Sequence, residues 1–237
     1  MDWKKLLLLP LALAVISGNI IAWYWVGVLL SRYICRNTDR EKVTDYTGTL
    51  SIKGCLVSDV MQGKDNSYYL THAADQSKNK YGCPFIDAGW TPDAQNLVIY
   101  GHNSLNGTGF SDLVKYRDFD FIQSHSLIRF TDRDGAEHAY KLVMVLDYST
   151  DYIRTHNPCA LTLPTDYVQR MEAFALFTNS AELQDVNKYA VSANKTPENV
   201  DNKAVYVDKY ITLSTCDAAT YGSKGRLVIV GKELPRG

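Results

Sequence analysis

A single cysteine stands at the end of a strand-like run, and an arginine opens the next such run. Ile211–Cys216 reads Ile-Thr-Leu-Ser-Thr-Cys, and Arg226 begins Arg-Leu-Val-Ile-Val ten residues after the cysteine. A cysteine nucleophile needs a lowered pKa or a base, and a fixed donor for the oxyanion that forms when it attacks a carbonyl. Because arginine stays protonated in proteins, Arg226 can hold that oxyanion but cannot be the base. A turn-rich segment joins the runs, so we expect the thiol and the guanidinium at the same end of two adjacent strands.

A histidine that could be the missing partner ends another strand-like run. His102 follows Leu97–Tyr100 in the segment Leu-Val-Ile-Tyr-Gly-His-Asn, so we expect its side chain at the start of a loop, where reactive groups project. We therefore predict Cys216, His102 and Arg226 as catalytic residues. Asn103, next to the histidine, is a candidate supporting residue.

Three residues beside Cys216 are candidates for supporting or substrate-binding roles. Asp217 could orient His102 as the third member of a triad, or it could only cap the turn after the cysteine. A carboxylate beside a thiol would also raise the pKa of that thiol, so both interpretations stay open. Ser214 and Thr215 are candidates for lining a substrate groove, although Thr215 fits a buried strand position equally well.

The composition is that of a globular domain and excludes some function classes. The 237 residues are 46% hydrophobic and 22% charged, which allows a sizeable core. A net charge of −1 without a basic stripe argues against nucleic acid as a partner. The five cysteines and five histidines show no metal-ligand spacing, so we expect neither a metal nor a cofactor.

An odd number of cysteines leaves at least one thiol free in an oxidising compartment, and Cys216 is the expected free one. For Cys35, Cys55, Cys83 and Cys159 we favour the interpretation of small buried residues. A Cys83–Cys159 disulfide stays open, because sequence alone does not establish the geometry of a bridge.

The amino terminus carries a long apolar run. Residues 6–30 contain no charged side chain and would form a helix of about 38 Å, enough to cross a hydrocarbon core of roughly 30 Å. The alternative is a cleaved signal peptide, because Ala12-Leu-Ala14 resembles a cleavage site, but the apolar run before that site, about six residues, is shorter than the usual h-region. We predict a short tail over 1–5, a transmembrane anchor over 6–30, a juxtamembrane stalk over 31–48 and a catalytic domain over 49–237. Basic residues flank both ends of the run, so the charge rule leaves its orientation open.

Short apolar runs separated by turn residues predict a mainly β domain. The expected strands are Thr49–Val57, Ser67–Thr71, a short piece within Gly82–Asp87, Leu97–Tyr100, a hairpin of Ser126–Thr131 and Ala139–Tyr148, Ile211–Cys216 and Arg226–Val230. Phe110–Tyr116 has the spacing of a helical turn.

One clearly helical segment interrupts the strands. Pro164–Phe177 places its apolar residues near one face, behind a cap at Thr165 or Asp166. The polar stretch 179–202 is predicted as a loop. Several short strands, short helices and this one inserted helix (about 164–177) favour a closed or partly closed β-barrel.

Together these motifs resemble the sortase family, and its class B branch in particular. The matching pieces are Tyr-Gly-His102-Asn103, Leu-Ser-Thr-Cys216 and Arg226-Leu-Val-Ile-Val-Gly-Lys. Gly82–Asp87 and the Phe121–His125 segment also match, although Cys83 stands where the family usually has another small residue. The resemblance covers about residues 49–234, and the inserted helix is typical of class B.

The resemblance implies a membrane-anchored cysteine transpeptidase with a sortase-type β-barrel. Cys216 would attack the threonine carbonyl in the C-terminal sorting motif of a secreted protein and hold the acyl group as a thioester. Arg226 would hold the oxyanion, and His102 would protonate the departing amine. An amine of cell-wall peptidoglycan would then accept the acyl group. Such substrates place the catalytic domain outside a Gram-positive-type cell membrane, with the amino terminus inside.

Two other functions are compatible with these residues. A pilin-polymerising sortase would use a protein lysine as acceptor, but the lid motif of the Asp-Pro-Trp or Asp-Pro-Phe type that such enzymes often carry is missing from 32–50, which favours wall anchoring. A non-catalytic, membrane-anchored β-domain that binds a ligand would leave Cys216, His102 and Arg226 with structural roles only. Selective labelling of Cys216 distinguishes an enzyme from such a domain.

Overall fold

The computed structural model describes residues 44–104, 109–164, 166–183 and 208–235. The predicted tail, the predicted anchor over 6–30, most of the predicted stalk and Cys35 lie outside these ranges. Within them, no helix is both long enough and apolar enough to span a membrane.

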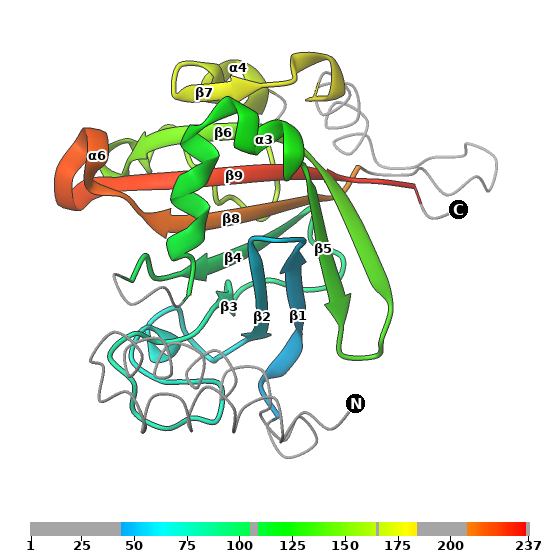
Figure 1. Ribbon diagram of the computed structural model, residues 1–237, viewed down its shortest axis with the longest axis vertical. Helices are drawn as coiled ribbons and strands as arrows, with labels where there is room; N and C mark the ends of the chain where they lie inside the picture. The colour runs from blue at the N-terminus through cyan, green and yellow to red at the C-terminus, as the bar shows by residue number, and fades with distance from the viewer. Residues whose placement is uncertain (1–43, 105–108, 165, 184–207, 236–237) are drawn as a thin grey trace, which may run out of the picture.

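Nine strands in the described ranges form one sheet that closes on itself (Figure 1). They are β1 Tyr46–Ile52, β2 Leu56–Met61, β3 Phe85–Ile86, β4 Asn96–Gly101, β5 Leu127–Asp132, β6 Glu137–Ser149, β7 Ala175–Thr178, β8 Tyr210–Cys216 and β9 Gly225–Glu233. Their order is β5-β1-β2-β3-β4-β8-β9-β6-β7, and β5 also pairs with β6. Eight strands therefore close a barrel, and β7 adds to the edge of β6. The predicted mainly β, closed barrel is confirmed.

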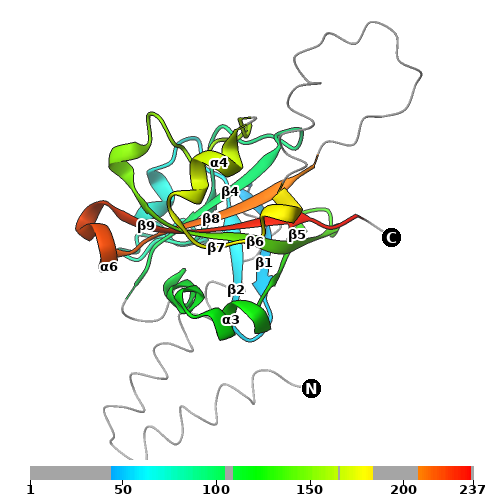
Figure 2. The same cartoon turned by 90° about the horizontal axis from the view of Figure 1, so that it is seen from above.

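Short helices occupy the connections between strands. The 3-10 helices are η1 Tyr68–Leu70, η2 Ser111–Arg117, η3 Thr150–Tyr152 and η4 Gly222–Lys224, and the α-helices are α3 Phe119–Ser124, α4 Tyr167–Glu172 and α6 Ala218–Tyr221. The helical turn predicted over Phe110–Tyr116 is confirmed as η2. Figures 1 and 2 show α4 on the side of β6 and β9, and α6 at the end of the barrel where β8 passes into β9.

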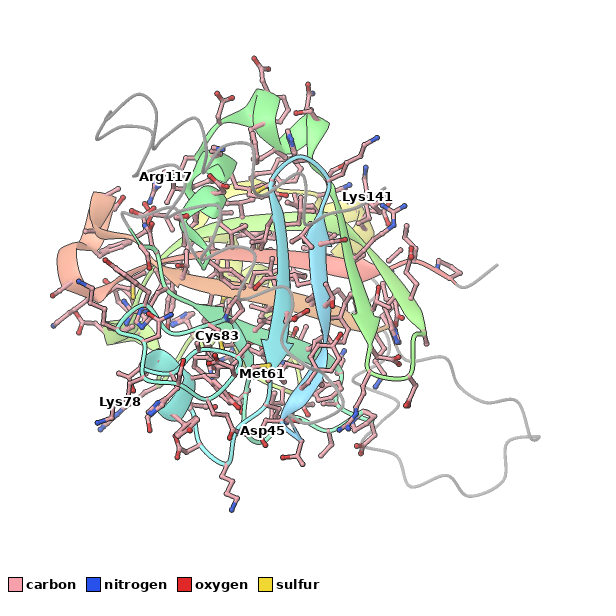
Figure 3. All side chains as sticks on the ribbon, turned by 60° about the horizontal axis from the view of Figure 1, so that its bottom comes forward. Asp45, Met61, Lys78, Cys83, Arg117 and Lys141 are labelled. Carbon is pink, nitrogen blue, oxygen red and sulfur yellow. The ribbon has the colours of Figure 1, made fainter. Side chains whose placement is uncertain are left out.

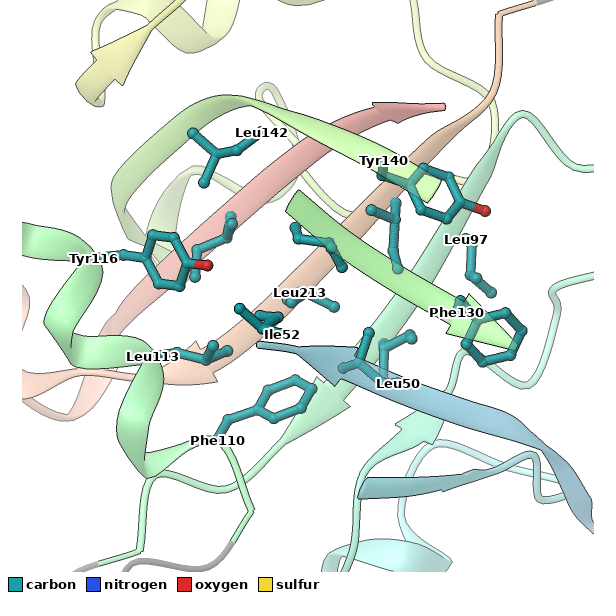
Figure 4. Packing of buried hydrophobic residues seen from close by; sticks show 14 of the residues in the cluster. Leu50, Ile52, Leu97, Phe110, Leu113, Tyr116, Phe130, Tyr140, Leu142 and Leu213 are labelled. Carbon is teal, nitrogen blue, oxygen red and sulfur yellow. The ribbon is translucent and has the colours of Figure 1, made fainter. Parts of the chain in front are cut away.

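The barrel interior is filled by one cluster of buried apolar side chains, shown in Figure 4. Side chains alternate across a strand, so every second residue of the barrel strands points inward. Ile99, Leu213 and Ile229 supply this cluster from β4, β8 and β9. Phe110 and Leu113 reach it from the η2 segment, so the helices after β4 close one end of the barrel.

A second buried cluster lies on the outer face of β6, β8 and β9. Val228 and Val230 of β9 pack there with Val168 and Met171 of α4. Because these alternate with inward residues such as Ile229, β9 is buried on both faces, which explains its nearly continuous apolar sequence.

Two of the strand predictions are wrong. Thr49–Val57 is not one strand but the end of β1, a tight turn and the start of β2, because Gly54 has a φ of 77° and reverses the chain. Ser67–Thr71 contains the helix η1 instead of a strand. Its start is fixed by the Asp65 carboxylate, which accepts hydrogen bonds from the backbone N–H groups of Ser67 and Tyr68.

The predicted helix over 164–177 is confirmed only in its first half. The α4 helix ends at Glu172, and Ala175–Thr178 becomes β7 because it pairs with the free edge of β6 at Met144–Leu146. Asp166 occupies the N-cap position, but its side chain forms an ion pair with Arg170 at 2.6 Å and makes no capping hydrogen bond. Tertiary pairing here overrides the helical periodicity.

Candidate active site

Three strand ends meet at one point of the barrel. The parallel pairing of β4 and β8 sets Gly101 beside Thr215, so His102 and Cys216 follow on neighbouring chains. The antiparallel pairing of β8 and β9 sets Cys216 directly opposite Arg226. The predicted placement of the thiol and the guanidinium at the same end of two adjacent strands is confirmed, and His102 joins them from the other side.

Strand alternation puts these side chains on the outer face of the barrel. Leu213 and Leu227 point into the interior cluster, so their neighbours Ser214 and Arg226 point away from it. A pocket of about 320 Å³ opens on this outer face. Its lining includes Cys216, His102, Arg226, Ser214 and Thr215 from the strand ends, and Asn66, Leu70, Ile153, Pro158 and Cys159 from the loops over them.

Cys216 is the exposed end of an otherwise buried strand. Residues 210–215 of β8 are all buried, and the exposure begins at the cysteine. Thr215 is 2% exposed, and its hydroxyl donates a 2.8 Å hydrogen bond to the carbonyl of Gly101. This bond fastens the residue before Cys216 to the residue before His102. Thr215 is therefore a buried strand residue that also borders the pocket.

The His102 ring is held by the backbone of the η1 segment. Its Nε2 lies 2.9 Å from the carbonyl oxygen of Leu70. A carbonyl only accepts hydrogen bonds, so Nε2 carries a proton and donates it to this contact. The ring orientation is therefore fixed through Nε2.

Arg226 is anchored through one end of its guanidinium. Its Nη1 donates to the carbonyl oxygens of Gly225 at 2.8 Å and Ser223 at 3.3 Å. A guanidinium has five N–H donors, so within the described part of the chain others remain for an oxygen in the pocket. The side chain is half-buried, which limits the screening of its charge by water.

Asp217 caps the next helix and does not belong to the pocket lining. Its Oδ1 accepts a 2.9 Å hydrogen bond from the N–H of Ala219, the N-cap contact of α6. Its Oδ2 accepts a 2.8 Å bond from Nε of Arg117. Of the two roles predicted for Asp217, the structure gives it the cap. Asn103 is exposed and does not belong to the pocket lining.

Comparison with known proteins decides the family of this barrel. Residues 60–234 match the domain family described as the Sortase domain. The chain belongs to the sortase family. It is 33% identical over 200 residues to sortase B of Listeria monocytogenes and 27% identical over 202 residues to sortase B of Staphylococcus aureus. These alignments span 82% and 81% of the chain, and each spans 72% of the relative.

The fold agrees with this assignment. The crystal structure of Clostridium perfringens sortase B superposes with a TM-score of 0.63 at 22% identity, covering 83% of this chain and 98% of that one. The chain is a class B sortase, and therefore a cysteine transpeptidase. The alternative of a non-catalytic β-domain is wrong.

The sortase pocket contains a second thiol that the sequence did not associate with the site. Cys159 is hydrogen-bonded to Ser214 and Tyr100, and burial raises the pKa of its thiol to about 12. It therefore stays protonated at neutral pH. Cys159 and Cys216 are free thiols, so the Cys83–Cys159 bridge considered from the sequence is absent.

Arg117, at the end of η2, is a further residue that the sequence did not indicate. Its guanidinium reaches Asp217 after β8 and Asp147 in β6. Partners 100 and 30 residues away leave no local pattern, so only the tertiary structure shows this cluster. No group of three or more His, Cys, Asp or Glu side chains in the described residues is arranged to hold a metal ion.

Proposed function

We propose that this class B sortase cleaves a C-terminal sorting motif of secreted proteins after a threonine and transfers the acyl group to an amine. Cys216 is the nucleophile, His102 transfers the proton and Arg226 holds the oxyanion. The observation that carries the proposal is the position of these three side chains at adjoining ends of β4, β8 and β9, on the wall of one pocket.

In the first half-reaction the Cys216 thiolate attacks the carbonyl carbon of the threonine, and the carbonyl oxygen becomes an oxyanion. Arg226 donates hydrogen bonds to this oxygen from a side chain that Gly225 already holds. The C–N bond then breaks, and His102, as an imidazolium, gives a proton to the departing amine. Since Nε2 is held on the Leu70 carbonyl, Nδ1 makes this transfer. A thioester remains on Cys216.

In the second half-reaction an acceptor amine attacks the thioester and passes its proton to His102. The C–S bond breaks, a new amide bond forms and Cys216 leaves as a thiolate. A thioester keeps the acyl group activated, so that an amine can capture it in place of water. In both half-reactions Arg226 stabilises the negative charge on the oxygen, and His102 transfers the proton.

The acceptor that we propose is an amine of a peptidoglycan precursor. Residues 6–30 would anchor the enzyme in the cell membrane with the amino terminus inside, so that the barrel faces secreted substrates and the wall. The sequence 32–50 carries no motif of a pilin-type lid, which favours wall anchoring over the polymerisation of pilins through a protein lysine.

The test is a cleavage screen with Leu-Pro-x-Thr-Gly, Asn-Pro-x-Thr-Asn and Ser/Pro-Pro-x-Thr-Gly peptides, with and without an amine acceptor. Cleavage of one motif should be abolished by Cys216→Ala. His102→Gln and Arg226→Met should each lower kcat by about 10²–10³.

Control variants outside the pocket are Cys55→Ala and Arg129→Met, which remove a half-buried thiol and an exposed guanidinium paired with Glu137. Both should keep near-normal kcat. Cleavage that survives Cys216→Ala, or an Arg226→Met variant as active as Arg129→Met, would contradict the proposed roles.

A further inference from the structure

A partly buried charge cluster lies next to the strand end that carries Cys216. Arg117 donates from Nε to Asp217 at 2.8 Å and from Nη2 to Asp147 at 2.9 Å. The Arg117 side chain is 28% exposed, and the two carboxylate side chains are 10% exposed or less. The hydroxyl of Thr220 in α6 also donates to Asp147. One guanidinium therefore joins η2, β6 and the segment that follows Cys216, on the side of the molecule where Figure 3 labels Arg117.

The cluster connects the two segments that carry the proposed nucleophile and proton donor. The η2 helix follows the loop that starts at His102, and Asp217 directly follows Cys216. Partial burial alone would lower the pKa of Arg117, but its hydrogen bonds to Asp147 and Asp217 outweigh burial and raise that pKa. The guanidinium therefore stays charged at any pH at which the enzyme works.

The charge balance of the cluster bears on the thiol. Asp217 and Asp147 bring two negative charges to this end of the barrel, and Arg117 brings one positive charge. A nearby carboxylate disfavours a thiolate and raises the pKa of the thiol, whereas a cation has the opposite effect. Cys216 also shares the pocket wall with His102, Arg226 and the protonated thiol of Cys159.

We propose that Arg117 is a positioning residue for the transpeptidation reaction. It holds the Asp217 carboxylate at the N-cap of α6 and offsets its negative charge next to the Cys216 thiol. The inference rests on the proposed function, because it takes Cys216 to be the nucleophile. Arg117 acts through Asp217 and does not contact the substrate.

The test measures the alkylation rate of Cys216 by iodoacetamide between pH 5 and 10, by mass spectrometry of its peptide. Arg117→Gln leaves two carboxylates without their cation, so the midpoint of the pH profile should rise by about 0.5–1 unit, and the rate at pH 7 should fall about 3–10-fold. Arg117→Lys keeps the charge and should stay near the wild-type midpoint.

A second variant, which removes the negative charge instead, keeps the test valid if Arg117→Gln folds poorly. Asp217→Asn retains the cap of α6, because asparagine also caps helices, and should lower the midpoint. The Arg117→Gln/Asp217→Asn double variant should return toward wild type. Asp147→Asn removes the other carboxylate that pairs with Arg117. Because Asp147 is not next to Cys216 in the chain, this variant should shift the midpoint less than Asp217→Asn does.

Two outcomes separate the inference from the proposed function. If the wild-type profile shows a reactive Cys216 and neither Arg117→Gln nor Asp217→Asn moves its midpoint in folded protein, the positioning role is wrong. If Cys216 in the wild-type enzyme reacts no faster than Cys55 or Cys159, the proposed nucleophile itself is wrong.

Discussion

At the residue scale, two thiols of one pocket have opposite properties. Cys216 is exposed at a strand end between an arginine and a histidine, whereas the Cys159 sulfur is buried against Ser214 and Tyr100. Burial raises the pKa of Cys159 to about 12, so its reactive anion is scarce at neutral pH. Reactivity in this pocket is therefore set by the surroundings of each cysteine.

The hydroxyl of Thr215 gives a prediction at this scale. Thr215→Val keeps the shape but removes the bond to the Gly101 carbonyl, which lies next to His102. We expect a loss of about 1–2 kcal/mol in unfolding free energy and a fall in kcat of about 3–10-fold. Urea unfolding and peptide-cleavage kinetics measure the two effects.

Thr212→Val is the matched control for that prediction. Thr212 is also buried on β8, and its hydroxyl donates to the Asn96 side chain at 2.9 Å, at the opposite end of the same strand pair. The Thr212→Val variant should lose a similar amount of unfolding free energy and keep the wild-type kcat. Equal losses of kcat in both variants would show that the Thr215 bond has no special role at the site.

At the element scale, the turn between β8 and β9 sets the distance between Cys216, the proposed nucleophile, and Arg226, the proposed oxyanion donor. Gly225 opens β9, and its carbonyl accepts a hydrogen bond from the N–H of Asp217. A Cβ at Gly225 would lie 1.9 Å from the carbonyl oxygen of Asp217. The backbone at Gly225 and the backbone at Asp217 can approach this closely only because glycine has no side chain.

Gly225→Ala should therefore separate Cys216 from Arg226. We expect a stability loss of about 2–4 kcal/mol and, in protein that remains folded, a loss of cleavage greater than 10-fold. Gly135→Ala is the control, because Gly135 has a φ of 88° in the β5–β6 turn and no atom within 4 Å of its would-be Cβ. It should cost about 1 kcal/mol and leave kcat unchanged. Thermal unfolding and cleavage kinetics compare the Gly225→Ala and Gly135→Ala variants. A fully active Gly225→Ala enzyme would contradict this account of the turn.

The strands that carry the site could be predicted from sequence, because β4, β8 and β9 are compact, β-branched runs ending in polar residues. The same reasoning failed where a single backbone angle or a distant partner decided the structure. Gly54 splits one apolar run into two strands, and the edge of β6 converts the end of a helical pattern into β7. Arg117 could not be found at all, since its ion pairs cross 30 and 100 residues of sequence.

At the scale of the whole molecule, folding buries a thiol that ionises only at high pH. The Cys159 thiol has a pKa of about 12 in the folded protein, against an ordinary value of 9.0. Below pH 9 it is protonated in both folded and unfolded states and adds no pH dependence. Between pH 9 and 12 the unfolded chain loses this proton first, so stability must fall as pH rises.

We therefore predict that Cys159 contributes about 2 kcal/mol to the loss of unfolding free energy between pH 8 and pH 10.5. Cys159→Ser keeps a hydroxyl for Ser214 and Tyr100 but does not titrate in this range, so its stability should fall by correspondingly less. Urea unfolding of both proteins at the two pH values gives the comparison. Identical losses would mean that the Cys159 thiol is not buried as described.

The central claim is that this sortase forms a thioester on Cys216 between its two half-reactions. Intact mass spectrometry after mixing the enzyme with its cleavable sorting peptide, without an amine acceptor, tests it most directly. We predict an added mass equal to the peptide up to its threonine, located on the Cys216 peptide, released by hydroxylamine and missing from Cys216→Ala. An adduct that resists hydroxylamine or persists in Cys216→Ala, or cleavage with no trapped acyl-enzyme, would contradict the account.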